Sequence, residues 1–265
     1  SVERKEQYKI ITRIFEEDGV KQVEKTTVSE RGNAHIERMA NFAKNSPYTT
    51  SGVELVACEK IDNGKVRFPY IKGSRLDQLI DEAVKREDWE TVWEKIRLLK
   101  QIIMNVKETE TFQMTEEFQK MFGTVSNLEG YVATKNVSLD MVSANMVVSD
   151  KIYILDYEWT FDFPIPLKFI LYRSILLNGT LNVISEENKK ILMEIVGISK
   201  EECDIFLQME IAFQKYVTGV SLNNLHPQMP TKCIVIGDGI PQTEPKRSLP
   251  YRAARKIKRM LVEKI

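Results

Sequence analysis

The spacing of apolar residues predicts a chain that begins with β-strands and continues with helices. Residues 8–15 and 20–28 are rich in β-branched and aromatic side chains and flank the turn Glu17-Asp18-Gly19, which predicts a hairpin. Residues 32–45 then carry apolar side chains at helical spacing, namely Ile36, Met39, Ala40 and Ala43. The chain therefore opens with two strands and a helix.

Two further β-type runs, residues 55–58 and 66–71, flank the turn Asp62-Asn63-Gly64, and Asn-Gly between such runs is a strong hairpin signal. After Gly73 the apolar period becomes helical, at residues 76–84, 89–107, 167–177, 186–196 and 203–217. This order predicts an α+β protein with a small β-rich N-terminal lobe holding one helix and a larger, mainly helical C-terminal lobe. We place the lobes at residues 1–72 and 73–237, followed by a linker and basic helical tail at 238–265.

Composition excludes some functions without choosing one. Hydrophobic residues make up 43% and charged residues 29%, which is ordinary for a globular protein. The 38 basic and 38 acidic residues cancel, so global charge gives no case for binding nucleic acid. Scattered Cys58, Cys203 and Cys233, with only two histidines, disfavour a structural zinc site and favour reduced thiols in the cytoplasm. The start at Ser1 rather than Met favours a piece of a longer protein.

The candidate chemistry lies in one short stretch. Asp140 is followed by Asn145 five positions later, and a β-type run, residues 151–155, ends at Asp156. Kinases use this arrangement to orient the acceptor hydroxyl and to hold the metals on ATP. Oxygen ligands of this kind suit Mg²⁺. Because the triplet can arise by chance, its weight depends on what precedes it.

Earlier residues supply candidates for the rest of a nucleotide site. Lys25 lies in the strand before the first helix and Glu37 lies within that helix; a kinase uses such a lysine for the α- and β-phosphates and such a glutamate to orient it. Two solvated side chains are the alternative. The backbone of Pro69, Tyr70 and Ile71, in an apolar run before Gly73, would suit adenine, whereas a plain strand between the lobes is the other interpretation.

In their order along the chain, residues 68–73, 139–145 and 154–158 resemble the aminoglycoside phosphotransferase and choline kinase-like family of the protein-kinase-like fold, over about residues 7–225. Asp-Tyr-Glu at residues 156–158 is the form of the metal motif typical of that family. The resemblance implies ATP and Mg²⁺ as cofactors, with these roles: Asp140 the catalytic base, Asn145 and Asp156 the metal ligands, Lys25 the phosphate lysine, Glu37 its partner. Glu158, two residues after Asp156, would contact the metal directly or through the metal's ligands; a buried structural carboxylate paired with Arg173 is the alternative.

Residues 156–173 are also similar to kinase-like modules attached to bacterial glycosyltransferases and methyltransferases of surface-polysaccharide assembly. This likeness implies a hydroxyl-bearing small molecule or glycan as acceptor, a fused or associated glycosyltransferase, and a cytoplasmic location at the inner face of the membrane. The basic tail, residues 252–265, would be a connector or a peripheral membrane contact.

Two departures leave an alternative open. Ser138 stands where most relatives have a histidine that braces the loop, and the acidic turn at residues 16–19 is a poor phosphate cradle. A pseudokinase that serves as a scaffold is therefore the alternative to an active phosphotransferase. A protein kinase is disfavoured, because the chain lacks Asp-Phe-Gly.

Overall fold

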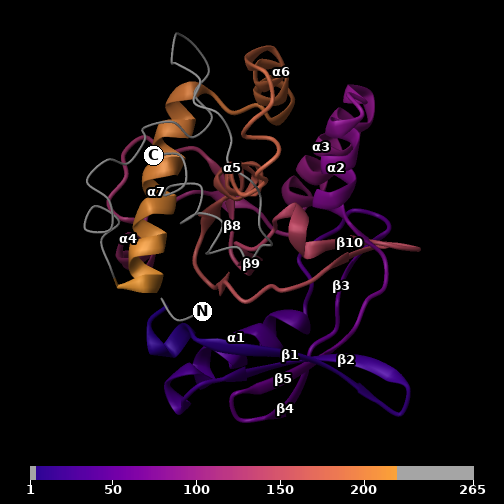
Figure 1. Ribbon diagram of the computed structural model, residues 1–265. Coiled ribbons are helices and arrows are strands. Elements are labelled where there is room, and N and C mark those ends of the chain that lie inside the picture. Colours follow the sequence, from indigo (N-terminus) through magenta and orange to yellow (C-terminus); the bar gives the residue numbers. More distant parts are fainter. Residues whose placement is uncertain (1–3, 220–265) are drawn as a thin grey trace.

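The computed structural model describes residues 4–219, and its N-terminal part is a four-stranded antiparallel sheet in the order β1-β2-β5-β4 (Figure 1). The strands are β1 (Ile10–Glu17), β2 (Val20–Thr27), β4 (Glu59–Asp62) and β5 (Lys65–Pro69). Asp18 and Gly19 join β1 to β2 with φ of 52° and 77°, the left-handed pair that a two-residue hairpin turn needs. The helix α1 (Asn33–Ala43) packs on this sheet through Ile36, Met39 and Ala40.

A second small sheet belongs to the C-terminal part, and it differs from the sequence-based expectation. Its order is β3-β11-β10-β6, with β3 (Val53–Leu55) parallel to β11 (Ile152–Ile154). The antiparallel members are β10 (Met146–Val148) and β6 (Ser74–Arg75). We expected the run at residues 55–58 to join the N-terminal sheet, but Val56 instead donates its backbone N–H to Ile154.

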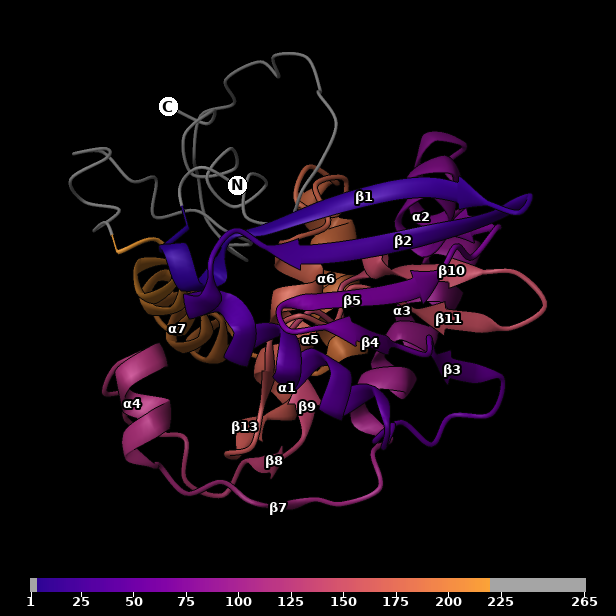
Figure 2. The same cartoon turned by 90° about the horizontal axis from the view of Figure 1, so that it is seen from below.

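The rest of the C-terminal part is mainly helical. Its helices are α2 (Leu76–Lys85), α3 (Trp89–Met104), α4 (Glu116–Phe122), α5 (Leu167–Leu176), α6 (Glu186–Val196) and α7 (Lys200–Thr218). Short strands link them: β7 (Glu110–Thr111), β8 (Val132–Thr134), β9 (Val137–Ser138), β12 (Thr160–Phe161) and β13 (Ile165–Pro166). Almost every residue of α5 is buried, as expected for a helix that is apolar on all sides and central to the core (Figure 2).

The first described residues connect the two parts. Lys5 donates its backbone N–H to the carbonyl of Val217 at 2.8 Å, and the hydroxyls of Tyr8 and Tyr216 are 2.8 Å apart. Tyr8 also packs against Trp159 and His35, with ring centroids 4.9 and 5.4 Å away. The turn η1 (Glu6–Tyr8) therefore ties the end of α7 to the base of α1.

The α+β class, with a β-rich N-terminal part and a mainly helical C-terminal part, is confirmed. The helices expected within residues 4–219 are all present, whereas α4 was not predicted. The linker at residues 238–250 and the basic tail at 252–265 lie outside the described residues. Among residues 4–219, none of the helices has the length and apolar character that a membrane span requires. The lobe boundaries at 72 and 237 stay a prediction.

Candidate functional site

The hairpin of β10 and β11 places the two predicted metal ligands at one end. Met146 pairs with Ile154, and Leu155 donates its backbone N–H to the carbonyl of Asn145 at 2.7 Å. Asn145 thus lies opposite Leu155, and Asp156 follows one residue later at the same end of the hairpin. Asp156 has a φ of 53°, a conformation that non-glycine residues adopt at a cost and that is common at functional sites. Local strand pairing, rather than distant packing, brings these residues together.

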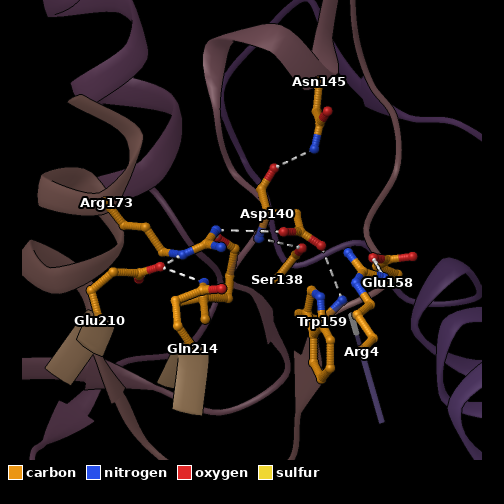
Figure 3. Close-up of polar contacts among 10 residues, drawn as sticks. Arg4, Ser138, Asp140, Asn145, Glu158, Trp159, Arg173, Glu210 and Gln214 are labelled. Atoms are coloured by element: carbon orange, nitrogen blue, oxygen red, sulfur yellow. Dashed lines mark hydrogen bonds and ion pairs between the residues drawn. The ribbon is translucent and has the colours of Figure 1, made fainter. Parts of the chain in front are cut away.

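Asp140 lies in the turn that follows β9, and its carboxylate is buried, with the residue 5% exposed. One oxygen accepts the backbone N–H of Trp159 at 3.1 Å, and the other lies 3.4 Å from a guanidinium nitrogen of Arg173 (Figure 3). Its backbone N–H donates to Ser138 Oγ at 3.1 Å, and its carbonyl accepts Asn145 Nδ2 at 3.1 Å. Asp140 is therefore held on several sides and linked directly to Asn145.

The buried setting changes the ionisation of Asp140. Burial raises the pKa of its carboxyl, Arg173 and Arg4 lower it, and the nearby anions Glu158 and Asp156 raise it further, so that the pKa is about 7. A carboxyl with such a pKa is substantially ionised near neutral pH and can also hold a proton there. That is the condition for a general base that accepts a hydroxyl proton.

Lys25 reaches the site from near the C-terminal end of β2, where its side chain is buried. Its ammonium forms an ion pair with Asp156 and lies 3.8 Å from Glu158 Oε2. Burial by itself would lower the pKa of Lys25, but the two carboxylates outweigh it and raise the pKa. The predicted phosphate lysine and the predicted metal aspartate are thus brought into direct contact.

Glu158 is paired with Arg4 rather than with Arg173, the partner considered from the sequence. Arg4 Nη1 lies 2.5 Å from Glu158 Oε1, and the guanidinium also lies over the ring of Trp159. Burial would raise the pKa of Glu158, but Arg4 and Lys25 lower it to about 2. Glu158 therefore stays ionised and stands between two cations. Sequence reasoning missed Arg4, because nothing local marks a terminal arginine as part of a site.

The predicted pair of Lys25 and Glu37 is not formed in the structure. Glu37 is exposed and its carboxylate binds Lys60 Nζ at 2.7 Å. The buried face of α1 presents His35 instead, whose ring lies 4.7 Å from that of Trp159. Burial lowers the pKa of His35 to about 4, so this histidine is neutral. The carboxylates beside Lys25 come from the loop after β11 and not from the helix.

The predicted adenine segment lies at the end of β5. Pro69 and Tyr70 are exposed, and Ile71 is partly buried. Proline has no backbone N–H, and Tyr70 donates its own to the carbonyl of Lys21 at 3.2 Å. Within residues 4–219, no backbone carbonyl accepts the N–H of Ile71. Among these three residues, Ile71 is therefore the one whose backbone N–H could donate a hydrogen bond to the edge of a purine.

The side-chain oxygen atoms of Asn145 and Asp156, at the end of the hairpin, are suitable ligands for Mg²⁺. Asn145 uses its amide nitrogen on Asp140, which leaves its amide oxygen to face outward. The Asp156 side chain is 49% exposed and presents a second oxygen beyond the one that Lys25 contacts. Within the described residues no group of three or more histidine, cysteine or acidic side chains is arranged to hold a metal. A two-ligand site suits Mg²⁺, which usually keeps waters and substrate phosphates as its other ligands.

No family model matches the chain, and no curated protein does either. Its structure is similar to a thermostable mutant of aminoglycoside phosphotransferase APH(4)-Ia, in ternary complex with ADP and hygromycin B, at 10% identity and a TM-score of 0.44, covering 82% of this chain and 88% of that one. Spectinomycin phosphotransferase APH(9)-Ia, in complex with ADP and spectinomycin, matches at 13% identity and 0.38, with 78% and 77% covered. Macrolide 2'-phosphotransferase MphH from Brachybacterium faecium, as the apoenzyme, matches at 12% and 0.38, with 84% and 85% covered. Because these TM-scores are low, the similarities carry no argument about function. The function of this chain is therefore inferred from the geometry of its own site.

Proposed function

We propose that this protein is an ATP- and Mg²⁺-dependent phosphotransferase that acts on a hydroxyl of a small molecule or glycan. The observation that carries the proposal is one connected set of contacts. Asn145 donates to the backbone of Asp140, Leu155 donates to Asn145, and Asp156, the residue after Leu155, pairs with Lys25. These contacts bring Asp140, Asn145, Asp156 and Lys25 together from three separate segments. They support the proposal because phosphoryl transfer requires a base, oxygen ligands for the metal and a phosphate-binding cation.

In the proposed reaction each residue has one task. Asp140 accepts the proton of the acceptor hydroxyl while that oxygen forms a bond to the γ-phosphorus and the bond from phosphorus to the β–γ bridging oxygen breaks, which leaves ADP. Lys25 binds the α- and β-phosphates, and Asn145 and Asp156 would hold Mg²⁺, which neutralises charge on the transferred group. The transition state is loose, so positioning and charge account for most of the rate enhancement.

Lys25 must leave Asp156 when the nucleotide binds. In the structure the ammonium is shared between Asp156 and Glu158, and Glu158 also has Arg4 as a partner. Phosphate oxygens would draw Lys25 away from Asp156 and free that carboxylate for the metal. Glu158 would then remain as the fixed anion beside the lysine, which is the role that the sequence assigned to Glu37.

The acceptor class follows from the likeness of residues 156–173 to modules of surface-polysaccharide assembly. A sugar hydroxyl is the acceptor that we favour on that ground, together with an attached glycosyltransferase and a membrane contact through the basic tail. None of the contacts among residues 4–219 bears on these points, so turnover is to be measured with sugars, amino alcohols and peptides as acceptors.

A nucleotide-binding module without turnover is the second candidate. The observation that favours it is the ion pair of Lys25 with Asp156, which places a cation on the carboxylate that the metal would need. In a scaffold this ion pair would persist. The two candidates differ in one measurable property, which is release of ADP in the presence of an acceptor.

The test measures binding and turnover separately. We expect ATP with Mg²⁺ to raise the Tm of the wild type by about 5–10 °C at a ligand concentration about 100 times Kd. Asp156→Asn and Lys25→Met should lose most of this shift. Asp150→Asn is the matched control, because Asp150 lies at the other end of the same hairpin, where its carboxylate accepts the hydroxyl of Tyr153. No shift in the wild type rejects both candidates, whereas a shift without ADP release on any acceptor leaves the scaffold.

A further inference from the structure

Arg4 reaches the site from the first described residues and binds one oxygen of Glu158. Its Nη1 lies 2.5 Å from Glu158 Oε1, and the guanidinium lies over the ring of Trp159, 5.7 Å from the centroid. Figure 3 shows Arg4 beside both residues. The side chains of Arg4 and Glu158 are only 15% and 10% exposed, so salt screens this ion pair weakly. Arg4 is thus part of a buried contact and not a solvated arginine.

The other oxygen of the same carboxylate faces Lys25. Glu158 Oε2 lies 3.8 Å from Lys25 Nζ, and the lysine side chain is 6% exposed. One carboxylate is therefore divided between two cations, with Arg4 at Oε1 and Lys25 at Oε2. Because the short contact at Oε1 limits rotation of the carboxylate, Arg4 determines where Oε2 points. The carboxylate is held near Lys25 without closing on it.

The segment around Arg4 is itself anchored on the end of α7. Lys5 donates its backbone N–H to the carbonyl of Val217 at 2.8 Å, and its ammonium lies over the ring of Tyr216, 5.0 Å from the centroid. Further along the segment, Tyr8 donates its hydroxyl to that of Tyr216 at 2.8 Å. These contacts fix the backbone that follows Arg4, so the last described helix sets the position from which Arg4 reaches Glu158.

We propose that Arg4 is a positioning residue for Lys25 and that it acts through Glu158. The inference deepens the proposed function and rests on it for the role of Lys25 toward the phosphates. With Arg4 on Oε1, Glu158 leaves the ammonium free to move from Asp156 to the nucleotide. Without Arg4, the buried carboxylate would close on Lys25, and that ion pair would compete with the phosphates. Arg4 itself would not contact the nucleotide.

Calorimetric titration of the whole chain with ATP and Mg²⁺ measures the predicted loss of affinity. Arg4→Met should raise Kd for ATP by about 10-fold, the effect expected when a group that holds a binding residue is removed. Arg4→Lys should restore most of the affinity, because it keeps a cation near Oε1. Arg31→Met is the matched control, since Arg31 pairs with Glu6 of the same segment at 3.3 Å in an exposed position. Equal losses in Arg4→Met and Arg31→Met, or a lysine variant no better than the methionine variant, would overturn the inference.

A double-mutant cycle tests the route through Glu158. Glu158→Gln keeps the shape and removes the charge that Arg4 binds, so adding Arg4→Met to it should change Kd for ATP by less than about 2-fold. A direct effect of Arg4 on the phosphates, or a general loosening of the fold, would be the same in both backgrounds, and that result would overturn the route. Arg4→Gln replaces Arg4→Met, with the same expected increase in Kd, if the methionine variant does not fold. With an accepted hydroxyl, KM for ATP should rise by more than kcat falls, because the base is unchanged.

A signal from Lys25 itself gives a readout that needs no nucleotide. In protein labelled with ¹⁵N at the lysine side chains and kept at one pH, the Lys25 ammonium is assigned by its loss in Lys25→Met. Its resonance should shift in Arg4→Met and keep its wild-type position in Arg31→Met; an unchanged resonance in Arg4→Met would overturn the inference even if ATP binds. If the wild type binds no ATP while the resonance shifts, the proposed function fails and the coupling of Arg4 to Lys25 stands.

Discussion

The two aspartates of the site are held in very different ways. Asp140 is buried, and its carboxylate receives a backbone N–H on one side and a guanidinium on the other. Asp156 is half exposed, lies at a φ of 53° and is held through a single lysine. Both aspartates follow short strands, and both would act on the same phosphoryl group. Asp140 is fixed by the core, whereas Asp156 is half exposed and has a single ion-pair partner.

This difference fits the two tasks that we propose for these aspartates. A base must already stand where the hydroxyl proton will be, so a fixed setting is useful before any ligand arrives. A metal ligand must exchange one partner for another, so a single ion pair that phosphates can displace is better than a closed network. The contrast therefore predicts that substitutions at Asp140 change rate, whereas substitutions at Asp156 change nucleotide and metal affinity.

The largest effects should come from exchanging the two carboxylates for amides. Asp140→Asn should lower kcat by about 10²- to 10⁴-fold while ATP and Mg²⁺ still raise the Tm, because the base does not hold the nucleotide. Asp156→Asn should remove most of the Mg²⁺-dependent part of the ATP affinity. Steady-state kinetics and calorimetric titration measure the two quantities. Equal losses of affinity in both variants would contradict the division of tasks.

A smaller effect is expected when Glu158, the carboxylate near Lys25, loses its ion pair with Arg4. Arg4→Met leaves the buried Glu158 with Lys25, 3.8 Å away, as its remaining partner among these two cations, which should cost about 1–3 kcal/mol of folding stability at pH 7. The folded pKa of Glu158, about 2, lies below its usual value of 4.5, so its contribution is present above pH 4.5 and is lost as pH falls toward 2. The destabilisation should therefore shrink in acid.

Urea unfolding of Arg4→Met at pH 7 and at pH 3 measures this effect. Arg31→Met is the matched control, because Arg31 pairs with Glu6 at 3.3 Å in an exposed position and should contribute little. A loss of stability in Arg4→Met that is the same at both pH values would show that packing of Arg4 on Trp159, rather than its charge, is what matters.

The buried setting of Asp140, the residue that we propose as the base, should also destabilise the fold at higher pH. Its folded pKa, about 7, is raised above the usual 3.8, so its favourable contribution is complete below pH 3.8 and is lost as pH rises through 7. The amide of Asp140→Asn cannot ionise, which favours the variant at high pH. Its NH₂ group would, however, face either the backbone N–H of Trp159 or the guanidinium of Arg173, both of which are donors, and this offsets part of the gain. We expect the net gain over the wild type to be about 1–2 kcal/mol at pH 8 and to vanish near pH 5.

Denaturant titrations of the wild type and Asp140→Asn across pH 5 to 8 test that expectation. The informative quantity is the difference between the two proteins, because other titrating groups cancel in it. A difference that is constant with pH would mean that Asp140 is ionised throughout, and the general-base role would then need another explanation for its activity near neutrality.

Local sequence patterns were enough to predict the parts of the site that are formed by residues close together in the sequence. The spacing of Asp140 and Asn145 and the β-type run before Asp156 are enough to predict a loop and a hairpin, and the structure brings these residues together. Arg173 was visible as a charge inside an apolar helix, which signals a buried partner. The sequence could not say that the partners are Glu210 and Asp140, because nothing in the spacing orients α5 against α7.

Two misses have clearer physical causes. Leu55 belongs to a run that reads as a strand of the first sheet, but it pairs in parallel with β11, about a hundred positions later, and such long-range pairing leaves no local signal. Glu37 could have been excluded. It follows Ile36 directly, so it lies about 100° around the helix from the stripe of Ile36, Met39 and Ala40 that faces the core.

The smallest effect on stability and nucleotide affinity is expected from substitution of Glu37. It tests the finding that Glu37 pairs with Lys60 and not with Lys25. Glu37 and Lys60 form an exposed pair that water and salt screen, so Glu37→Ala should leave both the stability and the affinity for ATP and Mg²⁺ almost unchanged. Lys25→Met should lower that affinity strongly, which makes it the reference in the same titration. A loss of ATP affinity in Glu37→Ala comparable to that in Lys25→Met would require α1 to rotate when the nucleotide binds, because only a rotation could bring that carboxylate from the surface to the buried lysine. The absence of such a loss would leave Glu158, fixed by Arg4, as the carboxylate that orients Lys25.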